Sequence, residues 1–375
     1  MIIWREIMAK GIKEQAIDLI TKKIPLSPEV QKMVAKELDK RWTQIAGKVT
    51  EKVKGVIDSK NEQKSAPGGN PAKWTDVPDS IFGAGEDYGI NAIAYGNKRF
   101  VAVADGGKIA YSADGIKWTA VSNSIFGDYS IYGIAYGNNR FVAVGWSDKI
   151  AYSVDGIKWT AVNSTFSEGA FAIAYGGDKF VAVGKAGEMA YSPDGASWTT
   201  VSDSSVWDFD NGKFTYQAEI KAIAYGGNRF VAVGEQGKIA YSPDGEKWTA
   251  VADSKFGTSN NTIEGIAYGI ADKIGGRFVA VGAGGKIAYS PDGAKWTAAS
   301  NNLFDYIYGI AYGSGRWVAV GHCGQMAYSP DGVTWTSAAD TSSEKHLHAI
   351  AYGIVGNAAG RFAAGGTDGS MWYSD

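Results

Sequence analysis

The residue types that bind transition metals gather late in the chain. His322, Cys323, His346 and His348 are all of the histidines and the only cysteine of the 375 residues. Zn²⁺ prefers imidazole and thiolate ligands, and His346 and His348, two residues apart, share a face if their segment is a strand. The spacing matches no zinc motif, and histidines also occur on polar surfaces. The sequence therefore leaves a metal site open as an alternative but predicts no metal and no cofactor.

Carboxylates offer a second chemistry. Glycoside hydrolysis needs two carboxyl groups that face each other, and Glu219, Glu235 and Glu264 are candidates. Lys221 stands among them and is more simply interpreted as a charge partner. The chain contains no G-x-S-x-G, no P-loop and no H-E-x-x-H motif. We therefore predict a protein without catalytic activity and keep a glycoside hydrolase as the alternative.

These residues lie in a repeated sequence. One tryptophan recurs about every 40–50 residues, at Trp74, Trp118, Trp159, Trp198, Trp248, Trp296 and Trp335. Each unit holds four short runs of the kind "IKAIAYG", "RFVAVG", "GKIAYS" and "KWTAV", separated by turn residues. Alternating apolar residues with Gly-rich turns indicate strands, and a period in the forties is typical of propeller blades. The sequence predicts a mostly β fold, a seven-bladed β-propeller of four-stranded antiparallel blades.

The two ends of the repeated region complete each other. The last unit stops at "SMWYSD", residues 370–375, without its fourth run, whereas residues 70–77, "NPAKWTDV", supply that run alone. We expect this N-terminal strand to enter the last blade and close the ring, which leaves only short, protected sheet edges. The predicted propeller spans residues 70–375.

The first part of the chain differs in pattern. Residues 1–59 show an apolar stripe at steps of three and four and a "PLSPEV" break, which predicts a small α-helical module of two amphipathic helices. Residues 60–69 are polar with glycine and proline and indicate a linker. So short a helix pair buries little surface alone. We expect residues 1–59 to mediate homo-oligomerisation or docking to an assembly.

Bulk composition limits the function classes. The net charge of −2 gives no indication of a nucleic-acid partner. No apolar run approaches the roughly 20 residues of a membrane span, and the N-terminus does not resemble a signal peptide. One cysteine fits a reducing compartment, so we expect a cytoplasmic protein.

A motif S-x-D-G-x-x-W ends in the repeated tryptophan. Its six copies begin at Ser112, Ser153, Ser192, Ser242, Ser290 and Ser329. The motif resembles the Asp-box, or BNR repeat, of sialidase-like and photosystem-assembly-factor-like propellers. The resemblance covers Trp74 to Asp375 and implies a structural hairpin between the third and fourth strands. Sialidases also need an arginine cluster, but every propeller arginine here occupies one repeated slot before "FVAVG": Arg99, Arg140, Arg229, Arg277, Arg316 and Arg361. The sialidase chemistry therefore does not carry over.

Where the units differ, they indicate recognition. One variable slot follows the second strand, and two others lie at the start of the first strand; topology places all of them on one face. Many of these residues are large and costly to expose, which favours a binding role over neutral variation. The predicted partner-binding residues are Asn91, Asp105, Tyr132, Trp146, Phe171, Lys185, Trp207, Lys221, Glu235, Glu264, Tyr306, Tyr308, His322 and His348.

The sequence therefore predicts a non-catalytic recognition or scaffold protein. Its most favoured ligand is a protein, because a mixture of aromatic, acidic and basic residues suits one asymmetric partner. A glycan is the alternative ligand. A multivalent lectin would repeat the same pocket in several blades and gain avidity from it.

Overall fold

The computed structural model describes residues 73–77, 81–83, 89–210, 215–257, 261–271, 275–300, 303–338, 343–356 and 359–374. All of these belong to the unit Asn70–Asp375. The predicted helices of residues 1–59 and the linker 60–69 lie outside the described residues. Within the described ranges, the chain forms strands and short 3-10 turns, and no helix there is long and apolar enough to cross a membrane.

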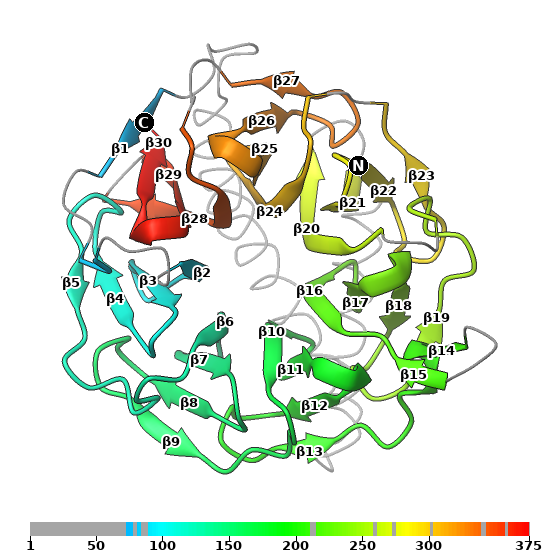
Figure 1. Ribbon diagram of the computed structural model, residues 1–375, viewed down its shortest axis with the longest axis horizontal. Coiled ribbons are helices and arrows are strands. Elements are labelled where there is room, and N and C mark those ends of the chain that lie inside the picture. The colour runs from blue at the N-terminus through cyan, green and yellow to red at the C-terminus, as the bar shows by residue number, and fades with distance from the viewer. Residues whose placement is uncertain are drawn as a thin grey trace, which may run out of the picture. The chain divides into compact units, whose positions relative to one another are not determined.

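The described strands form seven four-stranded antiparallel sheets, arranged as blades around a central channel (Figure 1). The seven-bladed propeller predicted from the repeat is confirmed. The first strand of each blade lies nearest the channel, and the fourth lies at the rim. One additional two-stranded hairpin follows blade 3.

The strand bounds follow the repeat. Blade 1 is β2 (Ile90–Gly96), β3 (Arg99–Ala104), β4 (Ile109–Ser112) and β5 (Thr119–Ala120). Blade 2 is β6 (Ile131–Gly137), β7 (Arg140–Gly145), β8 (Ile150–Ser153) and β9 (Thr160–Val162). Blade 3 is β10 (Ala170–Gly176), β11 (Lys179–Gly184), β12 (Met189–Ser192) and β13 (Thr199–Thr200). Blade 4 is β16 (Ile220–Gly226), β17 (Arg229–Gly234), β18 (Ile239–Ser242) and β19 (Thr249–Ala250).

The remaining blades are similar. Blade 5 is β20 (Ile263–Ala271), β21 (Gly275–Gly282), β22 (Ile287–Ser290) and β23 (Thr297–Ala298). Blade 6 is β24 (Ile307–Gly313), β25 (Arg316–Gly321), β26 (Met326–Ser329) and β27 (Thr336–Ser337). Blade 7 is β28 (Leu347–Val355), β29 (Ala359–Gly366), β30 (Met371–Ser374) and β1 (Trp74–Asp76). The additional hairpin is β14 (Asp208–Asp210) and β15 (Thr215–Gln217). The 3-10 turns are η1 (Lys185–Gly187), η2 (Ser205–Trp207), η3 (Glu235–Gly237), η4 (His322–Gly324) and η5 (Thr367–Gly369).

The ring closes through its two ends. β1 pairs antiparallel with β30, with Thr75 opposite Tyr373, and the Val77 N–H donates to the Met371 carbonyl at 2.9 Å. The first described strand is therefore the fourth strand of the last blade. The closure predicted from the incomplete repeats is confirmed.

The core lies between blades. In β3, Phe100 and Ala102 pack with blade 7 residues such as Ala363, whereas Val101 and Val103 pack with blade 2. Each second strand is therefore buried on both faces, which explains its nearly continuous apolar sequence.

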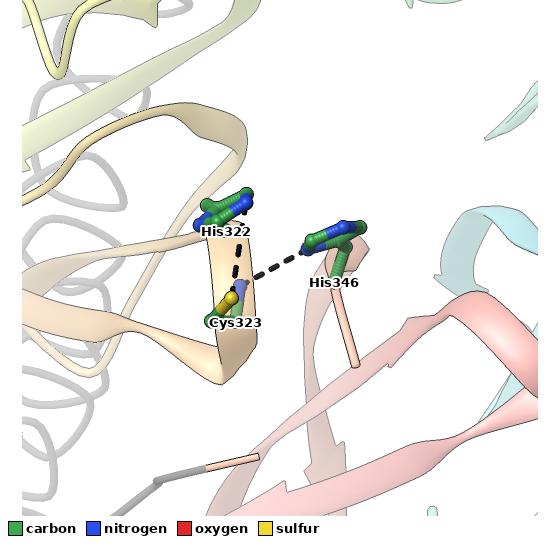
Figure 2. A group of neighbouring side chains, drawn as sticks. All are labelled: His322, Cys323 and His346. Atoms are coloured by element: carbon green, nitrogen blue, oxygen red, sulfur yellow. Dashed lines mark hydrogen bonds between the residues drawn. The ribbon is translucent and has the colours of Figure 1, made fainter. Parts of the chain in front are cut away.

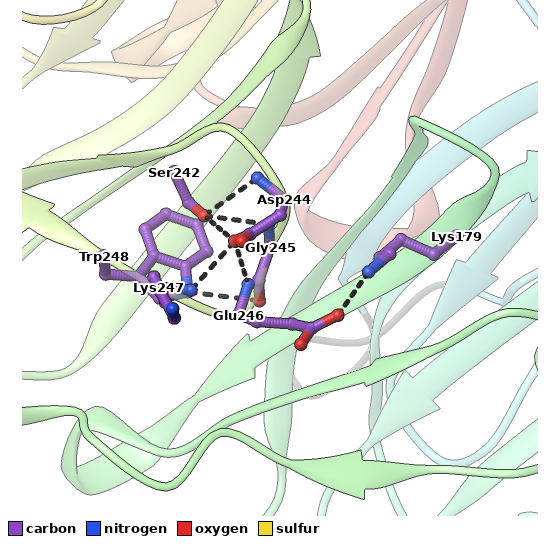
Figure 3. A network of polar contacts seen from close by, with 7 residues as sticks. All are labelled: Lys179, Ser242, Asp244, Gly245, Glu246, Lys247 and Trp248. Carbon is purple, nitrogen blue, oxygen red and sulfur yellow. Dashed lines mark hydrogen bonds and ion pairs between the residues drawn. The ribbon is translucent and has the colours of Figure 1, made fainter.

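The six S-x-D-G-x-x-W segments form turns with the same serine and aspartate contacts, and in four of them the tryptophan Nε1 also donates to the glycine carbonyl. In all six copies the Ser Oγ accepts the Gly N–H at 2.8 Å. Figure 3 shows blade 4, where Asp244 Oδ1 accepts the Glu246 and Lys247 N–H groups at 2.9 Å and Trp248 Nε1 donates to the Gly245 carbonyl. Gly245 has φ +77°, and a Cβ there would lie 2.6 Å from a valine methyl of blade 3. The motif is therefore a structural turn that also packs against the preceding blade.

The repeated arginines tie neighbouring blades together. Four of them donate from Nη1 at 2.7–2.8 Å to the carbonyl of the motif aspartate in the next blade. Arg361 reaches Asp114 in this way and so connects blade 7 to blade 1. Its guanidinium also lies 4.9 Å from the Tyr373 ring. In blade 3, Lys179 replaces the arginine and pairs with Glu246 of blade 4 at 2.6 Å (Figure 3). These cationic side chains have a structural role, as predicted from their repetition, because they connect neighbouring blades.

The six motif carboxyls predict an acid-sensitive fold. Burial disfavours their charged form, but hydrogen bonds from backbone N–H groups outweigh it, so the pKa of each lies below its usual value; for Asp194 the backbone bonds are the largest cause of the lowered pKa. Because the unfolded chain titrates near pH ~3.9, this stabilisation is fully present above that pH. It is lost as the pH falls through the lower folded-state values.

We therefore expect the free energy of unfolding, from urea titrations, to fall steeply below about pH 4. A variant with Asp114→Asn, Asp155→Asn and Asp292→Asn keeps an acceptor oxygen at each turn but removes three titrations. Its unfolding free energy should fall less between about pH 4 and pH 2 than that of the wild type. Parallel curves for the two proteins would contradict this assignment.

Candidate functional site

The variable slots meet on one face in every blade. In each blade, the residue that follows the second strand donates its backbone N–H to the carbonyl of the residue that directly precedes the first strand, at 2.9–3.3 Å. The seven donor–acceptor pairs are Asp105–Gly89, Trp146–Ser130, Lys185–Gly169, Glu235–Glu219, Ala283–Thr262, His322–Tyr306 and Thr367–His346. The face that carries these pairs is called the variable face below. The S-x-D-G-x-x-W turns lie at the opposite ends of the strands.

The remaining variable slot, the second residue of each first strand, surrounds the mouth of the channel. Seven equivalent residues line a cavity of about 230 Å³ there: Asn91, Tyr132, Phe171, Lys221, Glu264, Tyr308 and His348. Two residues further along each strand, an isoleucine lines the same cavity in all seven blades. The channel therefore has a constant apolar wall and a mouth whose chemistry changes from blade to blade.

An aromatic cluster with cations occupies blades 2 to 4. The Tyr132 ring meets those of Trp146 and Phe171 edge-on, at 6.4 and 5.3 Å between centroids. Lys185 Nζ lies 5.3 Å from the Trp146 centroid, and Lys221 Nζ lies 4.8 Å from that of Phe171. Trp146 is nevertheless 39% exposed. The structure brings five of the predicted residues together in a surface that offers aromatic and cationic contacts.

Each lysine of this cluster also forms an ion pair with a glutamate. Lys185 pairs with Glu168 at 2.6 Å, which raises the pKa of Lys185, and Lys221 pairs with Glu219 at 2.6 Å. Burial, followed by the nearby Asp105 charge, raises the pKa of Tyr132. The cluster is therefore balanced in charge and has directional polar groups at its margin.

A second aromatic cluster crosses blades 5 to 7. Tyr308 stacks on His348, with 4.6 Å between centroids and 15° between planes, and lies 4.7 Å from Tyr306. Tyr306 donates to Glu264 Oε1 at 2.6 Å. Burial lowers the pKa of His348, and Nε2 of this ring is buried without a hydrogen-bond partner among the described residues. His322 joins the cluster by stacking on His346 at 4.5 Å.

Acidic side chains of the variable face are used to hold backbone. Asp105 accepts the Gly89 N–H at 3.0 Å and the Asn91 side-chain amide at 2.9 Å. Glu235 accepts the Glu219 N–H at 3.1 Å in the same way. These carboxylates position the loops of the face.

The geometry does not favour the hydrolase alternative. Glu219 pairs with Lys221, Glu235 binds backbone, and Glu264 accepts from Tyr306. Burial and the Glu264 hydrogen bond raise the pKa of Tyr306. Some glycoside hydrolases use a tyrosine nucleophile, whose phenolate must form easily and which therefore needs a lowered pKa. The raised pKa of Tyr306 is a shift in the opposite direction.

Trp207 corrects the sequence-based prediction. The sequence predicts that Trp207 faces a partner, but its side chain is fully buried in η2 and packs with Val183 and Ile220 between blades 3 and 4. It takes the position that a buried phenylalanine holds in five of the six other blade-to-blade connections: Phe82, Phe126, Phe166, Phe256 and Phe304. Its large apolar surface fills the core and is not available for recognition.

The structure also shows residues that the sequence analysis missed. Tyr129, in the connection to blade 2, is 46% exposed, and Lys149 Nζ lies 5.7 Å from its ring centroid. Glu168, the partner of Lys185, stands in the connection to blade 3. All three extend the aromatic and charged surface around Trp146. The changing sequence of the connections was the signal that could have found them.

Comparisons with solved structures support the fold. YCF48 from Cyanidioschyzon merolae superposes with a TM-score of 0.60, at 16% identity over 81% of this chain and 98% of its own. A structure described as YCF48 bound to D1 peptide gives 0.60, at 16% identity over 82% and 98%. Virginiamycin B lyase from Staphylococcus aureus gives 0.63, at 11% identity over 81% and 99%.

The shared property is the propeller fold. At these identities the likeness carries no activity or partner to this chain. No protein-family model matches the sequence, and no curated protein matches it.

Proposed function

We propose that this chain is a non-catalytic recognition protein that binds one protein partner through its variable face. The observation that carries the proposal is the contrast between constant and variable positions. The isoleucines, arginines and motif turns repeat in the blades, whereas the channel mouth presents amide, aromatic, cationic, anionic and imidazole groups in turn. Such a sequence of groups suits a single asymmetric ligand.

The exposed aromatic cluster supports a protein ligand. Trp146 and Tyr129 remain partly exposed although both are large and apolar, and aromatic residues are enriched among the residues that dominate binding energy in protein interfaces. The similar fold of YCF48, in a structure described as bound to D1 peptide, adds a precedent for peptide binding by such a propeller. A lectin would repeat one pocket, which the described blades do not do.

Further parts of the proposal concern the rest of the chain. We assign the S-x-D-G-x-x-W turns to the Asp-box class. We assign residues 1–59 to two helices that mediate self-association or docking, and the protein to the cytoplasm. Self-association would display several variable faces at once and raise the avidity of a weak contact.

The test compares two triple variants in capture from source lysate. Tyr132→Ala/Trp146→Ala/Tyr308→Ala removes aromatic contacts from the variable face. Lys117→Ala/Lys158→Ala/Lys295→Ala changes exposed residues at the motif turns and serves as the matched control. We expect the first variant to capture no partner from the lysate. Its Kd for the identified partner, measured by calorimetry, should rise by at least about 100-fold, since central aromatic residues contribute ~2 kcal/mol or more each.

The control should bind like the wild type. Circular dichroism and urea titration show whether both variants keep the fold. Equal capture by the wild type and the aromatic variant would contradict the assignment of recognition to the variable face.

A further inference from the structure

Three side chains of blades 6 and 7 bring metal-binding atoms together. His322 and Cys323 are the first two residues of η4, and His346 directly precedes β28. One ligand atom from each lies within 4.8 Å of the others, and Cys323 Sγ is 3.7 Å from His322 Nε2. The imidazoles of His322 and His346 stack with 4.5 Å between centroids (Figure 2). The sequence shows only that these residues occur in neighbouring units, whereas the structure makes them one group.

Backbone contacts hold the two sides of the group in place. The His322 N–H donates to the Tyr306 carbonyl at 3.0 Å, and the Cys323 N–H donates to His346 Nδ1 at 3.1 Å. The His346 N–H in turn donates to Thr367 Oγ1 at 3.0 Å. The arrangement is therefore fixed by the loops and does not depend on a chance meeting of long side chains.

We propose that His322, Cys323 and His346 form a binding site for Zn²⁺ or a divalent ion of similar softness. Two imidazoles and a thiolate are ligands that Zn²⁺ prefers, and its tetrahedral bonds of about 2.0–2.3 Å require ligand atoms roughly 3.3–3.7 Å apart. The Cys323–His322 distance already meets this requirement. The His346 ligand atom lies within 4.8 Å of the other two, so metal binding requires this ring to move closer while the Tyr306 and Thr367 contacts keep the loops in place.

The fourth position belongs to water or to a group of a bound molecule, since the described residues place three ligands around this point. The site goes beyond the proposed recognition function and does not depend on it. A metal here would place a strong positive charge and an open coordination position beside the channel mouth.

The composition of the chain makes the site easy to identify. The protein has one cysteine and three histidines, so a thiolate bound to metal can arise only from Cys323 in a reduced chain. The equivalent positions in the other blades hold Gly106, Ser147, Ala186, Gln236, Gly284 and Asp368. The repeat therefore also supplies replacement residues that the fold accepts.

The test uses the full-length chain without a histidine tag, in a non-thiol reductant. Co²⁺ is added while the sulfur-to-cobalt charge-transfer band is recorded, and Zn²⁺ is then used to displace it. We expect one Co²⁺ per chain, a charge-transfer band, and displacement by Zn²⁺. Zn²⁺ affinity is measured by competition with a chromogenic chelator.

Three variants use residues already present at the same positions. Cys323→Ala copies Ala186, His322→Ala copies Ala283 and His346→Ser copies Ser130. Each is expected to raise the Kd for Zn²⁺ by more than about 100-fold, since even groups that only orient ligands contribute roughly 10–100-fold. Asp368→Ala, at the position of Cys323 in blade 7, is the matched control and should leave the Kd unchanged.

Two results would overturn the site. One is a wild-type chain that shows no thiolate band at high Co²⁺ concentration. The other is an unchanged Zn²⁺ affinity in all three folded ligand variants. Partner capture by the metal-stripped protein is a separate measurement, so failure of the metal site is distinguishable from failure of the recognition proposal.

Discussion

Gly226→Ala is expected to lower the free energy of unfolding by about 3 kcal/mol or more, because overpacking in a rigid core is strongly destabilising. Gly226 ends the first strand of blade 4, and a Cβ there would overlap the Tyr268 ring of blade 5. The same Gly–Tyr contact recurs between all seven pairs of neighbouring blades, from Gly96 with Tyr136 to Gly353 with Tyr95. Glycine is needed at this position for space, so the change strains the blade-to-blade contact itself.

The matched control is Gly315→Asn, in the turn between the first and second strands of blade 6. Gly315 has φ +72°, and a Cβ there would meet nothing within 4 Å. Asn139 and Asn228 hold the same position in blades 2 and 4, also with positive φ. This variant should unfold within about 0.5 kcal/mol of the wild type in urea. Similar losses in the two variants would show that the Gly–Tyr contact is not the cause.

Thr75→Pro is expected to open the ring. Thr75 lies in the middle of β1, opposite Tyr373 of β30. Proline interrupts this pairing because it has no N–H to donate, and β1 is linked to β30 only through the whole propeller. Its release leaves β30 as an unpaired edge, which promotes association between chains. We expect a large loss of unfolding free energy and concentration-dependent oligomers in size-exclusion chromatography.

The repeat provides the comparison for this variant. Thr119 lies opposite Tyr111 in blade 1, in the same register as Thr75 and Tyr373. The fourth strand there is joined to the third by a short turn, so it re-forms easily after local opening. Thr119→Pro should cost only about 1–3 kcal/mol, because it leaves the partly buried Tyr111 carbonyl without its ladder N–H, and the variant should elute in size-exclusion chromatography like the wild type. Equal losses of unfolding free energy and equal oligomerisation in the two proline variants would contradict a particular role of β1 in closing the ring.

The fold could be predicted because the same pattern of strands and turns recurs in every unit of the sequence. Each unit contains four alternating runs, and the last unit lacks the run that residues 70–77 provide. The variable slots could also be assigned to one face, since successive antiparallel strands reverse direction. The backbone bonds between the slots, such as Trp146 to Ser130, confirm that arrangement.

The candidate site could be predicted only in part, because side-chain environments depend on packing between blades. The residue type and the long connection predict an exposed Trp207, whereas the phenylalanines at the same position in other connections indicate the buried position that the structure shows. The contact of Cys323 with His346 depends on the left-handed turn at Cys323, φ +50°. The spacing of the two residues does not reveal it.

The most direct test of recognition by the variable face is site-specific photocrosslinking. A benzoylphenylalanine at position 129 replaces an exposed tyrosine next to Ser130, whose carbonyl accepts the Trp146 N–H. A second one at position 158 replaces an exposed lysine at a motif turn of blade 2. With the partner identified by capture, we predict crosslinks from position 129 and none from position 158. Crosslinks from position 158 alone would place the partner on the opposite face and contradict the account.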